Sequence, residues 1–164
     1  MEINIEEIYS LYVNDVYNYL YSLCKDKNKA EDLMQDTFYK AHVSLMSRDI
    51  QDIKPWLFKV AYYTYIDSIR KEKREVIKDD IDIVNYKTPE DITVDNSSYQ
   101  TLLNLLDRLL PNEKHAILLC DIQDCTYEQA SVILDLKINT LKSHLYRGRN
   151  KMREFIKKEK KNNG

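Results

Sequence analysis

Apolar side chains recur at helical spacing on both sides of one acidic stretch in which this spacing is absent. They repeat every three or four positions from residue 5 onward and again after residue 98, as in helices that bury one face. Only two glycines and three prolines occur among 164 residues, and no long alternation of apolar and polar residues suggests a strand. We therefore predict an all-α protein.

The acidic stretch, residues 76–97, divides the chain. It holds two Lys and six acidic residues around Pro89, a net charge of −4, and we interpret it as a flexible acidic linker. The alternative is an irregular acidic loop packed within one domain, but structureless loops of this length are uncommon inside compact domains. The prediction is therefore two small helical domains, residues 1–75 and 98–164.

Several function classes find no support in the residues. Cys24, Cys120 and Cys125 form no CxxC pair and are odd in number, which disfavours a zinc site and a disulfide framework. No phosphate-binding glycine loop or Ser/His/Asp grouping occurs. The N-terminus lacks a basic leader, and no apolar stretch reaches membrane-spanning length. We expect a cytoplasmic protein that is not an enzyme and uses no cofactor or metal.

The second helix of the first domain has one apolar and one polar row. We expect it to begin at Asn28, with Glu31 three residues later in a capping box. The predicted inward row is Ala30, Leu33, Met34, Phe38 and Ala41. The predicted outward row is Asp32, Gln35, Asp36, Tyr39 and Lys40. Periodicity alone makes the outward row an ordinary solvated face.

The third helix is predicted to begin after Pro55, because proline suits the first helical position. The side chains expected to face a core are Trp56, Leu57, Val60, Ala61, Thr64 and Ile69. The aromatic residues Tyr62, Tyr63 and Tyr65 are followed directly by four cations at positions 70–74. Aromatic rings beside cations suit stacking on unpaired bases, although an aromatic stripe at helical spacing also fits a core.

The second domain ends in two helices with a helix-turn-helix pattern. Thr126, and Asn112 farther upstream, are predicted N-caps, and Asp135 occupies the turn. The side chains able to meet phosphates or base edges in a major groove are Thr140, Lys142, Ser143, His144, Arg147 and Lys151. Residues 137–164 carry a net charge of +8, against −10 for the rest of the chain. The alternative is a basic tail that only aids solubility.

Three motifs, in their order and spacing, make the sequence resemble the extracytoplasmic-function (ECF) sigma factors of bacterial RNA polymerase, which contain only sigma regions two and four. The first, AEDLMQDTFYKA, resembles the family's polymerase-clamp helix. It matches at Asp32, Leu33, Gln35, Asp36 and Phe38. The resemblance implies that core RNA polymerase is bound, through the coiled coil of its β′ subunit, by Asp32, Leu33, Gln35 and Asp36.

The second motif, PWLFKVAYYTYIDSIRKEKR, resembles the helix that recognises and melts the −10 promoter element. The matching residues are Trp56, Leu57, Ala61, Asp67 and Arg70. The resemblance implies −10 DNA contacts from Tyr62, Tyr63, Asp67, Arg70, Lys71 and Arg74. Tyr63 stands where the family often has Asn, a departure that bears on the choice of −10 base.

The third motif, TYEQASVILDLKINTLKSHLYRGRNKMR, resembles sigma region four, whose last helix reads the −35 element. The matching residues are Thr140, Leu141, Lys142, Ser143, Leu145, Arg147 and Arg149. The resemblance implies −35 contacts from Thr140, Lys142, Ser143, His144, Tyr146, Arg147 and Arg149. Asp135 and Asn139 stand where Gly is usual, and His144 where Arg is common. Because Asp and Asn tolerate left-handed backbone, we expect the turn to survive.

The resemblance implies a transcription initiation factor, with a region-two domain at 1–75 and a region-four domain at 98–164. Its implied partners are core RNA polymerase, through the β′ clamp and the β flap, promoter DNA and an anti-sigma factor, often a membrane-bound one. The flap contact is expected from apolar residues between Leu105 and Ile117. The main alternative is a helix-turn-helix regulator of another kind, with an N-terminal dimerisation or sensing domain. A second is an antagonist that mimics a sigma factor.

Overall fold

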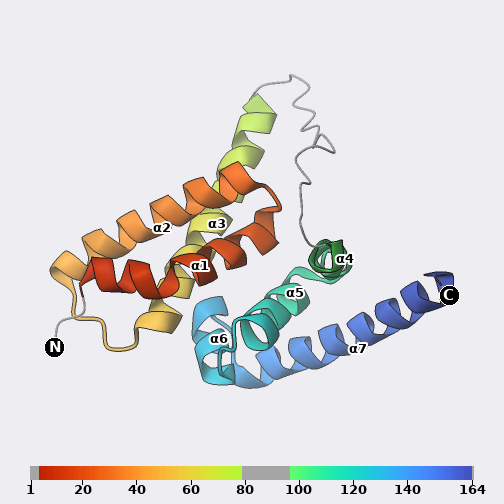
Figure 1. Cartoon of the computed structure of the whole chain (residues 1–164). Helices are drawn as coiled ribbons and strands as arrows, with labels where there is room; N and C mark the ends of the chain where they lie inside the picture. The colour runs from red at the N-terminus through yellow and green to blue at the C-terminus, as the bar shows by residue number, and fades with distance from the viewer. Residues whose placement is uncertain (1–3, 79–96, 164) are drawn as a thin grey trace. The chain divides into compact units, whose positions relative to one another are not determined.

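The computed structural model describes residues 4–78 and 97–163, and every regular element in these two ranges is a helix (Figure 1). The chain divides into two compact units, residues 1–93 and 94–164. The predicted all-α fold is thereby confirmed. Of the predicted linker, residues 79–96 lie outside the described residues, residues 76–78 continue a helix, and Ser97 begins the next one.

The first unit contains three helices: α1 (Ile5–Cys24), α2 (Lys27–Ser47) and α3 (Ile53–Lys78). Each packs against the other two, and α3 crosses the α1–α2 pair (Figure 1). Their fully buried side chains include Ile8, Val16, Tyr19, Leu20, Ala30, Ala41, Leu57, Phe58 and Ala61. The predicted inward row of α2 is buried as expected.

Several details of this unit differ from the sequence-based expectations. Helix α3 begins at Ile53, two residues before Pro55, so its predicted start after Pro55 is wrong. The N-cap of α2 is Asp26, whose carboxylate accepts a hydrogen bond from the Lys29 amide at 3.2 Å, so the predicted start at Asn28 is wrong. In α3 the fully buried aromatic ring is Phe58, which meets Tyr19 edge-on at 5.4 Å. Trp56, predicted to face the core, is only partly buried.

The second unit contains α4 (Ser97–Leu106), α5 (Pro111–Ile117), a π-helical turn (Leu118–Ile122), α6 (Tyr127–Leu134) and α7 (Ile138–Asn163). The long α7 contacts α4, α5 and α6. The fully buried leucine and isoleucine side chains include Leu103, Leu106, Leu119, Ile133 and Leu141. Through the π-helical turn, the helix that begins with α5 continues to Ile122.

Local capping explains where α5 and α6 begin. Thr126 Oγ1 accepts from the Gln129 amide at 3.1 Å, and Gln129 Oε1 accepts from the Thr126 amide at 3.0 Å. This reciprocal capping box confirms the Thr126 prediction. The prediction for Asn112 is wrong, because the N-cap of α5 is Leu110, two residues earlier, whose amide donates to Glu113 Oε1 at 3.1 Å.

The turn between α6 and α7 depends on a left-handed residue. Asp135 has φ 53° and ψ 49°, and the amide of Leu136 reaches back to the Ser131 carbonyl at 3.0 Å. The expectation that Asp tolerates this conformation is confirmed. Asn139 lies inside α7 and has no positive φ. No helix in residues 4–78 and 97–163 is long and apolar enough to cross a membrane.

Candidate nucleic-acid interface

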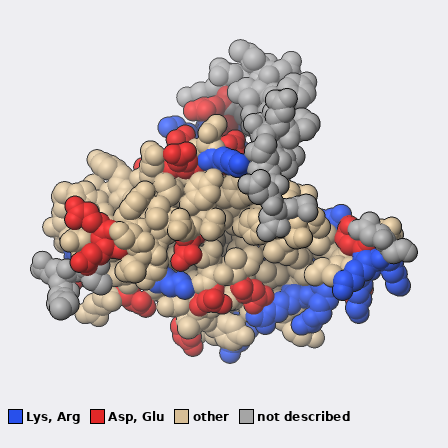
Figure 2. All heavy atoms as spheres, viewed as in Figure 1, with Lys and Arg blue, Asp and Glu red and all other residues tan. Residues whose placement is uncertain are grey.

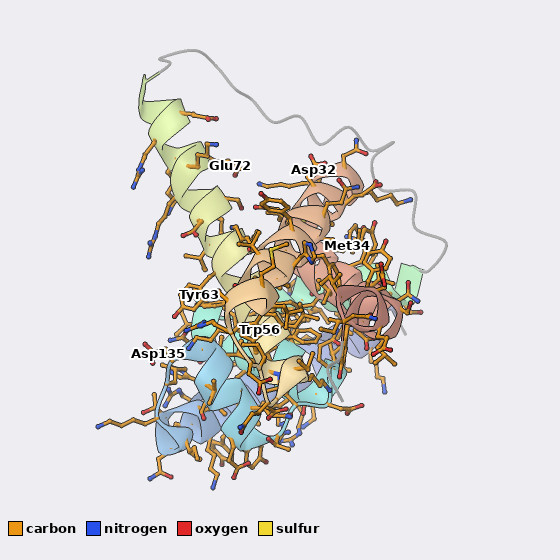
Figure 3. The ribbon with its side chains drawn as sticks, turned by 90° about the vertical axis from the view of Figure 1, so that its left-hand side faces the viewer. Asp32, Met34, Trp56, Tyr63, Glu72 and Asp135 are labelled. Atoms are coloured by element: carbon orange, nitrogen blue, oxygen red, sulfur yellow. The ribbon has the colours of Figure 1, made fainter. Side chains whose placement is uncertain are left out.

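The polar row of α2 lies on the surface of the first unit. Asp32, Gln35 and Asp36 are exposed, and Figure 3 shows Asp32 near the start of the helix. Leu33 belongs to the predicted contact set, but its side chain is buried. It packs beneath the exposed row and does not offer a contact surface of its own. Asp36 lies 3.3 Å from Lys40 one turn later.

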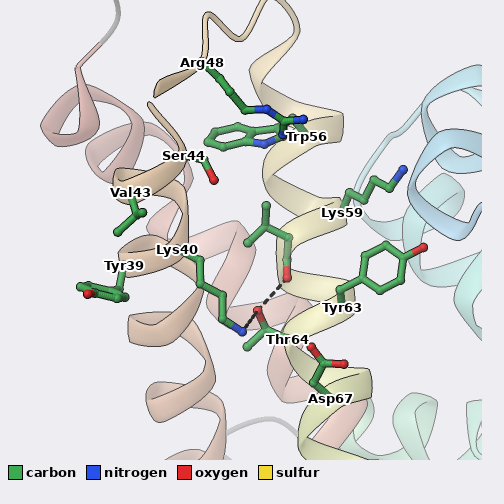
Figure 4. A pocket seen from close by; sticks show the side chains of 11 residues that line it. Tyr39, Lys40, Val43, Ser44, Arg48, Trp56, Lys59, Tyr63, Thr64 and Asp67 are labelled. Atoms are coloured by element: carbon green, nitrogen blue, oxygen red, sulfur yellow. Dashed lines mark hydrogen bonds between the residues drawn. The ribbon is translucent and has the colours of Figure 1, made fainter. Parts of the chain in front are cut away.

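Lys40 joins this row to α3. Its ammonium donates to Thr64 Oγ1 at 3.3 Å, and the Thr64 hydroxyl donates to the Val60 carbonyl at 2.7 Å (Figure 4). From Tyr39 onward, the same side of α2 becomes apolar, since Tyr39, Val43 and Met46 are all exposed. One side of α2 therefore offers carboxylates near its N-terminus and apolar surface toward its C-terminus.

A pocket of about 620 Å³ lies between α2 and α3 (Figure 4). Its lining includes Tyr39, Arg48, Trp56, Lys59, Tyr63 and Asp67. Tyr63 is exposed, and Lys59 Nζ lies 6.0 Å from the centre of its ring. Rings and cations side by side are suited to a planar base attached to a phosphate.

The pocket brings together only part of the predicted −10 set. Tyr63 and Asp67 line it, whereas Tyr62 is half-buried and meets Tyr63 edge-on at 5.4 Å. Burial raises the pKa of Tyr62, and the neighbouring Tyr63 adds to this. The cations Arg70, Lys71 and Arg74 are exposed on later turns of α3.

Sequence reasoning missed the contribution of Lys59 and Arg48 to this pocket. A signal for Lys59 was available, because Trp56, Lys59, Tyr63 and Asp67 follow helical spacing on one side of α3 (Figure 4). No comparable signal existed for Arg48, which follows the end of α2 and reaches the pocket only through the tertiary fold.

The predicted −35 residues lie on the first half of α7. Thr140, Lys142, Ser143, Tyr146 and Arg147 are exposed, and His144 and Arg149 are partly buried. Figure 2 shows Lys and Arg side chains gathered along this helix. The Lys142 ammonium lies 5.5 Å from the centre of the Tyr127 ring at the start of α6.

Two cations of α7 are held by carboxylates from other elements. Arg149 donates through Nε and a terminal nitrogen to Asp121 at 3.0 and 2.6 Å, and this hydrogen bonding raises the pKa of the guanidinium. Lys151 donates to both oxygens of Glu113, at 2.9 and 3.1 Å. Lys151, expected to face DNA, is thus turned toward α5.

Helices α5 and α7 approach each other closely at Gly148. A Cβ atom there would lie 2.9 Å from Ile117 Cδ1 and 3.3 Å from the Glu113 carbonyl oxygen. Glycine therefore permits the contact that brings the Glu113 carboxylate against α7. Within the described residues, no group of three or more His, Cys, Asp or Glu could hold a metal ion.

Comparisons with known proteins cover both units. The family profile for sigma-70 region 2 matches residues 8–75, and that for sigma-70 region 4 matches residues 99–152. The ECF RNA polymerase sigma factor SigM of Bacillus subtilis is 37% identical over 155 residues, which are 91% of this chain and 93% of the relative. The chain belongs to the ECF sigma factors. This sigma factor therefore binds core RNA polymerase and directs it to promoters.

Two solved structures share the fold. The sigma factor RpoE of Bartonella quintana, in complex with the anti-sigma factor NepR, is 28% identical with a TM-score of 0.77, and the match covers 93% of this chain and 96% of that one. CnrH, in complex with the cytosolic domain of CnrY, shares the fold at 16% identity and a TM-score of 0.70, over 93% and 87% of the two chains. Matches to both sigma regions exclude the alternative of an unrelated helix-turn-helix regulator.

Proposed function

We propose that three exposed helix faces divide the work of this sigma factor. The α2 row Asp32, Gln35 and Asp36 binds the β′ clamp coiled coil, the α3 side of the first unit binds the −10 element, and α7 reads the −35 element. The observation that carries the proposal is that each motif presents polar side chains opposite a buried face. The corresponding domains are residues 1–75 and 98–164, joined by residues 76–97.

The pocket between α2 and α3 supports the −10 assignment. An unpaired base could enter beside Trp56 and Tyr63, while Lys59 and Arg48 neutralise its phosphate. The exposed cations Arg70, Lys71 and Arg74 would follow the strand beyond the pocket. Base stacking stabilises the single strand over the duplex, which is how this surface would assist melting at the −10 element.

The first half of α7 suits a major groove, as recognition helices contact base edges through their N-terminal residues. The proposed −35 contact set comprises Thr140, Lys142, Ser143, His144, Tyr146, Arg147 and Arg149. Because Asp121 already binds two nitrogens of Arg149, we expect Arg149 to lie beside the DNA backbone with its charge largely neutralised and not to read a base. Arg147 is the candidate for bidentate base readout.

The remaining partners follow from family membership. We propose that region four also docks on the β flap through apolar surface between Leu105 and Ile117. RpoE, at 28% identity, was solved with an anti-sigma factor, and we propose that an anti-sigma factor, free or membrane-anchored, also covers these surfaces here. The protein would act in the cytoplasm as an initiation factor without catalytic activity of its own.

In vitro transcription with core RNA polymerase tests the proposal. Wild-type protein should give promoter-specific transcripts that core enzyme alone does not give. Asp36→Lys should weaken core binding about tenfold or more, since a carboxylate facing a partner is replaced by a cation. Its unfolding free energy should change by only about 0.5 kcal/mol, because Asp36 is exposed.

Asp15→Lys is the matched control, because Asp15 is an exposed acidic residue within α1 of the same unit. It should bind core polymerase like wild type. Equal core affinity of the Asp36 and Asp15 variants would remove the docking assignment from α2. Promoter-independent transcription by the wild-type holoenzyme would contradict the assignment of promoter-reading surfaces.

A further inference from the structure

Glu113 is a charged residue with no exposed surface. Its side chain is 0% exposed, yet it stands against the promoter-facing helix of the second unit. Its carboxylate accepts two hydrogen bonds from Lys151 and one from the Leu110 amide. Burying a carboxylate costs free energy unless such partners surround it. The fold therefore requires a cation of α7 to stay beside Glu113.

Two α7 cations lie near this carboxylate, at different distances. Lys151 Nζ lies 2.9 Å from Glu113 Oε1 and donates hydrogen bonds to the carboxylate, whereas Arg147 Nε makes only a longer ion pair, 3.8 Å from Oε2 and beyond hydrogen-bonding distance. Arg147 and Lys151 are four residues apart, so both side chains leave α7 on the same side. Lys151 therefore holds the position that Arg147 could otherwise take.

Arg147 remains directed outward in this arrangement. Its side chain is 53% exposed, and a terminal nitrogen donates to His144 Nδ1 at 3.2 Å. Both residues belong to the proposed −35 contact set. A guanidinium binds carboxylates through two parallel hydrogen bonds, so a Glu113 carboxylate that lacks its lysine partner would draw Arg147 inward and away from DNA.

We propose that Lys151 is a positioning residue for promoter reading: by occupying Glu113 it leaves Arg147 free to contact the −35 element. The inference rests on the proposed function of Arg147. It assigns Lys151 no direct DNA contact. The competing explanation is that Lys151, with a side chain 43% exposed, binds a phosphate itself.

A mutant cycle in the holoenzyme separates the two explanations. Core polymerase with each variant selects promoters from a library randomised at the −35 element, and discrimination is the enrichment of the sequence that wild type prefers. Lys151→Met should lower discrimination about tenfold, as should Arg147→Ala, because loss of a bidentate base contact has this size. Adding Glu113→Gln to Lys151→Met should restore discrimination to within about twofold of the wild-type value, because the charge that attracts Arg147 is then gone.

Lys151→Arg keeps a cation on Glu113 and should discriminate like wild type, with circular dichroism checking that every variant folds. A phosphate contact predicts a different pattern. Lys151→Met would then weaken binding to all promoter sequences equally and reduce the slope of log K against log salt concentration by about one. Adding Glu113→Gln would restore nothing. That pattern, or unchanged discrimination in Lys151→Met, would overturn the proposal. If Arg147→Ala keeps full discrimination, the −35 role of Arg147 fails and the inference fails with it.

Discussion

His115 is a histidine that the fold keeps uncharged. It is 6% exposed on α5, and burial, with the nearby charge of Lys114, lowers its pKa from 6.5 to about 4. Between pH 6.5 and pH 4 the unfolded chain therefore binds a proton that the folded chain does not. By linkage, this contribution to stability is complete above pH 6.5 and is lost as the pH falls toward 4.

Across that range, we predict that the free energy of unfolding of the second unit falls by roughly 3 kcal/mol. Urea unfolding followed by circular dichroism at several pH values measures it. The single tryptophan, Trp56, lies in the first unit and gives an internal control by fluorescence. His115→Leu should flatten the pH dependence between pH 6.5 and 4.5, and an unchanged slope in this variant would show that another group is responsible. Below about pH 4.5, Glu113 adds to the loss.

Glu113 also contributes to acid sensitivity, but here the fold favours the charged form of the side chain. Burial alone would raise the pKa of its carboxyl, but hydrogen bonds from Lys151 and the Leu110 amide, with the charges of Lys151 and Arg147, lower it below its usual value. Its stabilising effect is thus present above the ordinary pKa of a glutamate and is lost as the pH falls through the lowered one. Both buried groups of α5 make the second unit acid-sensitive.

At the scale of the helices, the α6–α7 connection depends on the backbone of Asp135. Its left-handed conformation costs most residues about 1–2 kcal/mol, little for Asn and nothing for Gly. We predict that Asp135→Val lowers the stability of the second unit by about 1–2 kcal/mol, with Asp135→Asn and Asp135→Gly within about 0.5 kcal/mol of wild type. Thermal melting measures the series. Similar melting of the Val and Asn variants would contradict the argument.

Local signals in the sequence located this connection but not every helix start. Thr126 and Gln129 could be recognised as a capping box because both partners lie within four residues. Near α2, both Asp26 and Asn28 are good N-caps, and the choice between them depends on which residues the rest of the unit buries. The same limit applied to Trp56 and Phe58, since packing against Tyr19 in α1 decides which ring is buried.

The exposed faces of the candidate sites followed from helical spacing, whereas their ion pairs did not. Asp32, Gln35 and Asp36 are exposed because the opposite row of α2 is buried. The pairs of Glu113 with Lys151 and of Asp121 with Arg149 join residues 38 and 28 positions apart. Periodicity carries no information on such partners. Neither the helical pattern that placed Lys151 toward DNA nor the resemblance that implied a −35 contact from Arg149 revealed the carboxylates that hold them.

At the scale of the whole molecule, charge is divided between a basic end and an acidic remainder. Residues 137–164 carry +8 and the rest −10. The basic end offers fewer free charges to DNA than its sequence suggests, because carboxylates of the same unit hold Arg149 and Lys151. Nonspecific DNA affinity depends on the number of phosphates that cations neutralise, so these ion pairs should limit binding to arbitrary DNA.

Asp121→Asn tests this consequence, because it releases Arg149 from its bidentate partner. The slope of log K against log salt for a promoter-free duplex should become steeper by about 0.9, and affinity at low salt should rise. Asp124→Asn is the matched control: Asp124 is exposed, lies three residues away, and its positive φ of 55° suits Asn. It removes the same charge without freeing an α7 cation, so its slope should equal that of wild type. Fluorescence anisotropy titrations of the full chain across salt concentrations provide both slopes, and equal changes in the two variants would mean that net charge, not the Asp121–Arg149 pair, limits nonspecific binding.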